Sequence, residues 1–303
     1  MIRLRKESVF MVEVSGLYKG YDNDKPVLQN MNIKVEKGTI HGLIGHNGCG
    51  KTTLIKCLNG IFKPDKGVVL VDGEPVYNNP SVKEKIGYVA DSNQFFPGYK
   101  IEKLVKFFEG VYPKFSREDF NRLNQIFGLN TKKKVKQLSK GQQMRLAFML
   151  SMAQHPEVMI LDEPTSGLDV IAKKNLLDLL VTTVENEEMT VIISSHHLSD
   201  LEKICDTLTM MKDGKTQIDD EMEEVTGQVK KYQVVFPKGA PGEFYHMEET
   251  LHISNLGSVY TIILRNEPED FVLKMEEMGS VLTEEMDCSL EEAFIYLNEE
   301  VQK

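Results

Sequence analysis

The sequence contains no tryptophan, only 4 cysteines in 303 residues, and fewer basic than acidic side chains. Because it has no continuous run of about 18 apolar residues, no segment is expected to span a bilayer. The 36 lysines and arginines against 46 aspartates and glutamates give a net charge of -10, which argues against nucleic acid as the main partner. The cysteines follow no metal-binding or disulfide spacing, which is typical of a reducing compartment; they are Cys49, Cys57, Cys205 and Cys288.

What the sequence does contain is a glycine-rich segment at residues 45–52 that matches the pattern G-x4-G-K-[ST]. Its glycines allow backbone N–H groups to converge on phosphate oxygens, while Lys51 reaches the β and γ phosphates and the Thr52 hydroxyl ligates Mg²⁺. A strand is predicted before it and a helix after it, and a helix N-terminus attracts anions. The expected ligand is a nucleoside triphosphate with Mg²⁺, bound by Gly45, Asn47, Gly48, Cys49, Gly50, Lys51, Thr52 and Thr53.

Cys49 is the one cysteine inside this phosphate loop. Its position beside a helix N-terminus favours the thiolate, although a small residue that merely fits the loop is the simpler interpretation. In either case a bulky thiol reagent on Cys49 is expected to block nucleotide binding, and ATP is expected to protect the thiol.

Strand and helix patterns alternate between residues 39 and 211, which predicts a layered α/β core. The apolar runs at residues 158–161 and 190–194 are predicted to be central parallel strands that are buried on two faces. Turn and strand signals at residues 65–73 predict antiparallel pairing, and helical spacing between residues 101 and 135 predicts two or three helices of an inserted subdomain.

The composition changes after Gln217. An acidic run at residues 219–224 is either a linker or the solvated face of a helix. The patterns that follow predict a small α+β domain over residues 228–303, with strands at residues 231–236 and 259–264 and a helix near residues 271–278.

Two carboxylates, Asp162 and Glu163, come directly after the apolar run at residues 158–161. Because ligands collect at the carboxyl ends of parallel strands, we expect both side chains to meet the phosphate loop. Asp162 is predicted to hold Mg²⁺ through water, and Glu163 to face the γ phosphate and polarise the attacking water. Asp162 is therefore a metal candidate and Glu163 a catalytic candidate.

Between the phosphate loop and these carboxylates lies Leu138-Ser139-Lys140-Gly141-Gln142, which resembles the signature motif of ATP-binding-cassette (ABC) ATPases. Ser166-Gly167-Leu168-Asp169 resembles the family's D-loop, whose Asp169 is expected at the nucleotide, and Ser194-Ser195-His196 resembles its switch-histidine strand end. The resemblance covers residues 11 to about 220. It implies a P-loop NTPase core with an antiparallel β subdomain and an inserted α-helical subdomain at about residues 92–138.

The resemblance also implies roles for single residues. The Ser139 hydroxyl and the Gly141 backbone N–H of one subunit would meet the γ phosphate held by the phosphate loop of another, which requires a head-to-tail dimer. His196 would hydrogen-bond the γ phosphate and report its presence, and so joins Glu163 and Lys51 as a catalytic candidate. Tyr21 is similar to the aromatic residue that stacks on adenine, with Tyr18 as the alternative.

The chain departs from the family pattern at two positions. Asp91 stands where the family usually has Gln, so the group that completes the Mg²⁺ and water shell is Asp91, Asn93 or Gln94, with Asp91 favoured by its position. Lys140 replaces the first Gly of the signature, a milder change because the backbone N–H groups remain.

The function implied by the resemblance is that of the ATPase subunit of an ABC transporter, peripheral to the cell membrane on its cytoplasmic side. Its partners would be a separate transmembrane permease subunit and a second ATPase subunit, either an identical copy or a paralogue. The segment Ser289–Phe294 is similar to the tail of exporter-type subunits and favours export over import. Ser289 and Glu292 form a capping box that predicts a last helix with an apolar face at Leu290, Phe294, Leu297 and Val301.

A soluble ABC ATPase that acts on ribosomes or DNA is the alternative. Proteins of that kind carry a long coiled coil between phosphate loop and signature, or two cassettes in one chain, and neither is present. A regulatory GTPase would need an Asn-Lys-x-Asp motif, which the sequence lacks. The transported substance is not encoded in this chain, because in the family the membrane subunit reads it.

Overall fold

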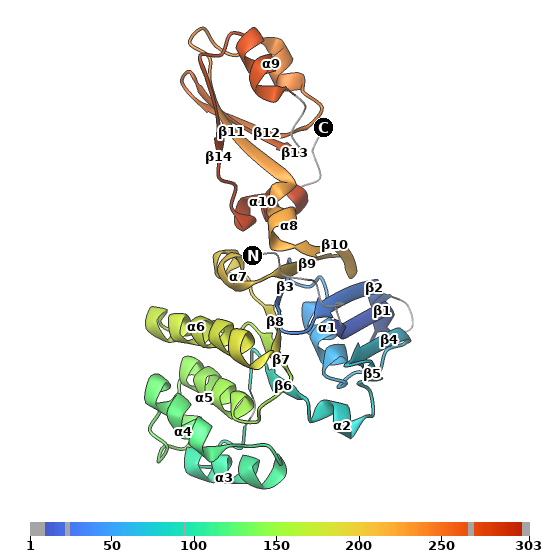
Figure 1. The fold of residues 1–303 in the computed structure, drawn as a ribbon, viewed down its shortest axis with the longest axis vertical. Helices are drawn as coiled ribbons and strands as arrows, with labels where there is room; N and C mark the ends of the chain where they lie inside the picture. Colours follow the sequence, from blue (N-terminus) through green and yellow to red (C-terminus); the bar gives the residue numbers. More distant parts are fainter. Residues whose placement is uncertain (1–9, 22–24, 94, 266–269, 299–303) are drawn as a thin grey trace. The chain divides into compact units, whose positions relative to one another are not determined.

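The computed structural model describes residues 10–21, 25–93, 95–265 and 270–298. The chain forms two compact units, Met1–Asp219 and Asp220–Lys303, called unit 1 and unit 2 below (Figure 1). Each unit has its own sheets and its own hydrophobic core. Two residues named above, Gln94 and Val301, lie outside the described residues.

Unit 1 is built around a six-stranded sheet with the order β10-β9-β3-β8-β7-β6. From β9 to β6 the neighbouring strands run parallel. Every residue of β7 (Val158–Asp162) and β8 (Thr190–Ser194) is buried, which confirms the prediction of central parallel strands. The other strands are β3 (Ile40–Gly45), β6 (Ile86–Val89), β9 (Thr207–Lys212) and β10 (Lys215–Glu221).

The parallel arrangement places the segments of functional interest at one edge of the sheet. Strand β3 leads into the phosphate loop, β7 ends at Asp162, and β8 ends two residues before His196. Because β7 and β3 both pair with β8 in parallel, their carboxyl ends open at the same side. The helices that follow are α1 (Lys51–Leu58), α6 (Val170–Glu187) and α7 (Leu198–Ile204).

A second sheet in unit 1 is antiparallel, with the order β2-β1-β4-β5. Strand β1 pairs with both β2 and β4, so the predicted antiparallel pairing near residues 65–73 is confirmed. Helix α1 contacts strands of both sheets, so the phosphate loop lies where the two sheets meet (Figure 1). The elements of this part are β1 (Phe10–Gly20), β2 (Pro26–Glu36), β4 (Lys66–Val71), β5 (Glu74–Pro75) and α2 (Pro80–Lys83).

The predicted helical segment is present between β6 and β7. Helix α3 (Ile101–Val111) and helix α4 (Arg117–Phe127) bury apolar residues at helical spacing. Helix α5 (Lys140–Met152) follows the short turn η1 (Val135–Gln137), contacts α4 and β6, and begins inside the signature. The helical segment and the signature are thus one connected part of unit 1.

Unit 2 contains an antiparallel sheet with the order β12-β13-β11-β14, as expected of a small α+β fold. Its core lies on one face of this sheet, where Tyr232 packs against Phe271 with 4.6 Å between ring centroids. The elements are α8 (Met222–Gly227), β11 (Val229–Val235), η2 (Gly242–His246), β12 (Thr250–Leu256), β13 (Val259–Arg265), α9 (Phe271–Glu277), β14 (Leu282–Met286) and α10 (Leu290–Asn298).

The acidic run at residues 219–224 belongs to regular structure. It occupies the end of β10 and the first turn of α8, where Met222 and Val225 are buried while Glu223 and Glu224 are exposed. The helix-face interpretation therefore fits the second half of the run, and the boundary between the two units falls at the start of the run, after Asp219. The capping box of the last helix is confirmed, because Glu292 N donates to Ser289 Oγ and Ser289 N donates to a Glu292 carboxylate oxygen.

Candidate nucleotide-binding site

The phosphate loop joins β3 to α1 without any acidic residue in the first turn of the helix. Gly50 stands before α1 with φ +111, and no side chain caps the first N–H groups there. Lys51 folds back over the loop, where its Nζ donates to the carbonyl oxygen of Gly45 at 2.5 Å and of His46 at 3.3 Å. Free N–H groups, a helix dipole and one ammonium group therefore converge at this point, which suits a phosphate chain.

The glycine at position 45 is required by close packing. A Cβ there would lie 2.5 Å from the carbonyl oxygen of Met211 and 2.6 Å from the Sγ of Cys49. Asn47 and Gly48 form the exposed tip of the loop. The loop is thus pressed against β9 at its start and open to solvent at its tip, where a ligand can approach.

Cys49 is a buried residue of the loop. Burial raises the pKa of its thiol, and the nearby charge of Lys51 lowers it by less. The expectation of a thiolate is therefore wrong, because loss of hydration outweighs the helix N-terminus at this position.

Thr52 and Asp162 approach each other across the end of the sheet, with Thr52 Oγ1 3.5 Å from Asp162 Oδ2. The other carboxylate oxygen of Asp162 accepts a hydrogen bond from Ser194 Oγ at 2.7 Å. Burial raises the pKa of Asp162, and the charges of Glu163 and Asp91 add to this effect. A hydroxyl and a buried carboxylate that a cation would keep ionised fit a Mg²⁺ ion whose remaining ligands are phosphate and water.

Glu163 occupies an unusual backbone conformation, with φ +53 directly after β7. Its N–H donates to the carbonyl oxygen of Ser194, and its carboxylate lies 2.5 Å from Nδ1 of His196. Left-handed non-glycine residues concentrate at functional sites, where surrounding bonds hold them. The structure therefore brings the two catalytic candidates Glu163 and His196 into direct contact.

Ser139 caps helix α5 through a capping box with Gln142. Gly141 follows in the first turn and approaches Gly167 so closely that a Cβ would lie 2.2 Å from the Gly167 carbonyl oxygen. The Lys140 Nζ lies 2.8 Å from Asp91 Oδ1 and 3.1 Å from Ser166 Oγ. The two residues that depart from the family pattern are therefore bonded to each other.

Asp169 and Tyr21 complete the predicted set. Asp169 caps α6, since Ala172 N donates to its Oδ1 at 2.9 Å, and this bond lowers the pKa of the Asp169 carboxyl. Tyr21 is 60% exposed, and its hydroxyl lies 2.9 Å from Thr53 Oγ1 in the first turn of α1. The ring of Tyr18 is covered by the Lys66 ammonium at 5.5 Å, which leaves Tyr21 as the accessible aromatic face.

Ser194 is a residue of this site for which no role of its own was predicted. Its hydroxyl donates to Asp162 and accepts from Glu163 N, so one side chain orients both carboxylate residues. In the sequence it is the last residue of a predicted buried strand and the first residue of the segment that ends at His196. Such a position gains meaning only when the neighbouring strand is known.

Comparison with known proteins places this geometry in a family. Residues 28–166 match the family model described as ABC transporter. The chain is 30% identical to the ABC transporter ATP-binding protein YtrB of Bacillus subtilis over 285 residues, 94% of this chain and 97% of that protein. It is 37% identical over 210 residues to the uncharacterized ABC transporter ATP-binding protein MJ1023 of Methanocaldococcus jannaschii, covering 67% of this chain and 75% of that protein.

The chain belongs to the ABC transporter ATP-binding proteins. Members bind and hydrolyse ATP, dimerise, and work with a membrane permease. Among solved structures, cbiO1 from Clostridium perfringens, part of the ABC transporter complex cbiONQ, is 29% identical with a TM-score of 0.61, and covers 72% of this chain and 91% of that chain. The dimeric cassette MJ0796 shares the fold at 22% identity with a TM-score of 0.64, over 70% of this chain and 99% of that chain.

In the described part of the chain, no helix has both the length and the apolar composition needed to cross a membrane.

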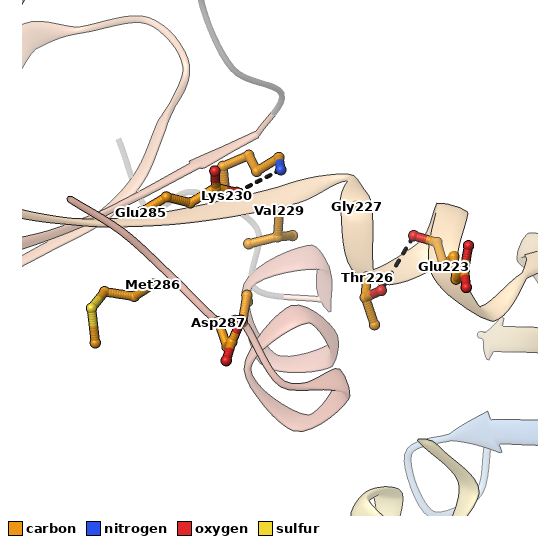
Figure 2. A pocket seen from close by; sticks show the side chains of 9 residues that line it. Glu223, Thr226, Gly227, Val229, Lys230, Glu285, Met286 and Asp287 are labelled. Atoms are coloured by element: carbon orange, nitrogen blue, oxygen red, sulfur yellow. Dashed lines mark hydrogen bonds and ion pairs between the residues drawn. The ribbon is translucent and has the colours of Figure 1, made fainter. Parts of the chain in front are cut away.

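A separate hollow lies in unit 2, away from the predicted site residues. Unit 2 has a hollow of about 490 Å³ beside α8 and β14, shown in Figure 2, where Lys230 pairs with Glu285. None of the predicted site residues lines it.

Proposed function

We propose that this ABC ATP-binding subunit hydrolyses Mg²⁺-ATP within a head-to-tail dimer and thereby drives export through a separate permease. The observation that carries the proposal is the contact between Glu163 and His196 at the end of β7, beside the pair of Thr52 and Asp162. A water molecule held by Glu163 would stand at the edge of the sheet where the phosphate loop presents the γ phosphate. Catalysis of this kind consists of positioning and electrostatic stabilisation.

Different residues of the site would bind the nucleotide and take part in the reaction. Gly45, Asn47, Gly48, Cys49 and Gly50 supply the backbone cradle, and Lys51 neutralises the β and γ phosphates. Thr52 and Asp162 would hold Mg²⁺, which supplies charge neutralisation at the phosphates. His196 would sense the γ phosphate, and its bond to Glu163 keeps the carboxylate directed toward the site. Tyr21 would stack on the adenine, with Thr53 orienting its hydroxyl.

The second protomer would complete each site. Ser139 and Gly141 stand at the N-terminus of α5, where N–H groups and the helix dipole attract a phosphate. In the head-to-tail arrangement this turn meets the γ phosphate held by the other protomer, and Asp169 lies beside it. The dimer consists of two copies of this chain or of this chain and a paralogue.

Export is the direction we propose, on the cytoplasmic side of the cell membrane. It is supported by the segment Ser289–Phe294, which forms the capped start of α10 and is similar to the tail of exporter-type subunits. The names of relatives do not decide the direction, because one is a methionine import protein of Protochlamydia amoebophila, while the name of another, a bacitracin transport protein of Bacillus licheniformis, states no direction.

Inverted membrane vesicles that contain this subunit and its permease test the proposal. ATP added outside should drive compounds into the vesicles, where mass spectrometry detects them, and vesicles with Lys51→Ala should accumulate none. Accumulation only in right-side-out vesicles loaded with ATP would show import instead. Failure of the subunit to co-purify with any membrane protein would favour the soluble alternative.

A further inference from the structure

The two departures from the family pattern form one ion pair. Asp91 follows β6, and Lys140 is the first residue of α5, 49 positions later in the sequence. The Lys140 Nζ lies 2.8 Å from Asp91 Oδ1, and the same ammonium lies 3.1 Å from the hydroxyl of Ser166 after β7. One side chain thus joins the signature to segments that follow two neighbouring strands of the sheet.

The charges of the pair compensate each other. An amide at position 91 and a glycine at position 140 are both neutral, whereas this chain has one carboxylate and one ammonium there. An unpaired Asp91 would add a negative charge near Asp162, whose pKa it already raises. Lys140 supplies the opposite charge at 2.8 Å, so the pair adds no net charge at this edge of the sheet.

The contacts around the pair show that α5 is anchored at its first turn. Gly141 touches the backbone of Gly167, and Arg145 lies 4.0 Å from the carboxylate of Asp169 one turn further along α5. The whole segment from Ser166 to Asp169 is therefore held by one face of α5. Lys140 is the residue of this face that also reaches the end of β6.

We propose that Lys140 is a positioning residue that fixes the signature turn against the ends of β6 and β7 through Asp91 and Ser166. The contacts of Lys140 with Asp91 and Ser166, called the bridge below, determine where Ser139 and Gly141 are presented to the nucleotide of the second protomer. This inference rests on the proposed function, since it places the bridge at the nucleotide site that two protomers would share. The proposal assigns Asp91 to this bridge, in place of the metal-ligand role that its position in the sequence favours.

The bridge makes a distinctive kinetic prediction. Lys140 and Asp91 do not belong to the phosphate loop of their own protomer, so their removal should leave ATP affinity of the single protomer within twofold. A misplaced signature turn should instead weaken ATP-dependent pairing and lower kcat, because small displacements of aligned groups cost up to about 100-fold in rate. We expect a loss in kcat of about tenfold for either Asp91→Asn or Lys140→Gln.

A double-mutant cycle on the full chain tests the bridge. The double variant Asp91→Asn with Lys140→Gln should lose no more kcat than either single variant, because the bridge is lost once. Exchanging the charges, with Asp91→Lys and Lys140→Asp together, should restore kcat to within about threefold of the natural chain. Lys140→Arg should also keep the activity. Both side chains are about half exposed, at 50% and 56%, so the variants are expected to fold.

A matched control is the ion pair between Glu109 and Arg117, which joins α3 and α4 at 2.5 Å and is 43% exposed on both sides. Glu109→Gln with Arg117→Gln should leave kcat unchanged. The inference is overturned if the natural chain hydrolyses ATP while both single variants stay within twofold of it, if the losses multiply in the double variant, or if ATP affinity falls with kcat. A natural chain that hydrolyses no ATP would instead contradict the proposed function.

Discussion

The two units of this chain differ sharply in charge. Residues 1–219 contain 30 basic and 27 acidic side chains, a net charge of +3, whereas residues 220–303 contain 6 basic and 19 acidic side chains, a net charge of -13. Together these give the -10 of the whole chain. The total is therefore the sum of a nearly neutral unit and a strongly acidic one. The nearly neutral unit holds every proposed nucleotide contact, and the acidic unit holds none.

The net charge of the whole chain therefore describes neither unit well. A total charge of -10 disfavours polyanions as partners, but the negative charge lies in unit 2, while the phosphate site lies in unit 1. Local groups decide whether a phosphate binds, and at this site they are Lys51, free N–H groups and a helix dipole. Substitutions in each unit can show whether ATP binding and hydrolysis depend on unit 1 alone and whether the two units unfold separately.

The largest effect is expected for Glu163→Gln in unit 1. The amide cannot polarise water as the carboxylate does, so ATP turnover should fall by about 100-fold to 10,000-fold while ATP binding is kept. Phosphate release and equilibrium binding of labelled ATP measure the two quantities. The matched change Glu277→Gln on α9 of unit 2 should leave turnover within twofold. Natural turnover by the Glu163 variant would refute the assignment of this residue.

Phe271→Ala should act on unit 2 alone. Phe271 is 1% exposed and packs on Tyr232, so truncation leaves a cavity that costs about 3–5 kcal/mol of the free energy of unfolding. Urea unfolding should show an earlier transition, and limited proteolysis with mass spectrometry should locate the cleavage in unit 2. ATP affinity is expected to stay unchanged. A parallel loss of ATP affinity would show that the two units do not separate as described.

His41 should make the stability of unit 1 depend on pH. It is buried between Thr207 and Thr209, with Asp219 Oδ1 3.9 Å from Nε2, and burial lowers its pKa from 6.5 to about 4. The unfolded chain then binds the proton more readily, so this stabilisation is present above pH 6.5 and is lost as pH falls to 4. The expected loss is about 3 kcal/mol. Urea unfolding at several pH values should show a flatter slope for His41→Asn, and equal slopes would contradict the account.

Tyr21→Ala should have the smallest effect of the four. Stacking of a base on an aromatic side chain contributes about 1–3 kcal/mol, so the Kd for ATP should rise about 5-fold to 150-fold. Tyr77→Ala, which removes another exposed tyrosine of unit 1, is the control and should leave the Kd unchanged. If Tyr18→Ala raises the Kd and Tyr21→Ala does not, the adenine lies on the other aromatic residue.

Local signals explain how much of the fold was predictable. The phosphate loop, β7 and β8 were recognised because their patterns are continuous in sequence and their strands are buried on both faces. Strands β12 and β14 of unit 2 were missed, because both are edge strands with few buried residues and little alternation. The short helix α8 was hidden by the acidic residues on its exposed face.

The candidate site shows the same limit. The sequence suggested that Asp162 would meet the phosphate loop, and the structure places it 3.5 Å from Thr52. The bond between Glu163 and His196 and the bridge between Asp91 and Lys140 could not be predicted, because their partners are 33 and 49 positions apart. Such pairs follow from strand order, which a single sequence does not reveal.

Sedimentation equilibrium can detect the proposed head-to-tail dimer and its dependence on nucleotide. The Glu163→Gln protein should be a dimer with Mg²⁺-ATP and a monomer with ADP or without nucleotide. Adding Ser139→Arg should return it to a monomer that still binds ATP. An ATP-saturated monomer, or a dimer that forms equally with or without ATP, would contradict the shared site.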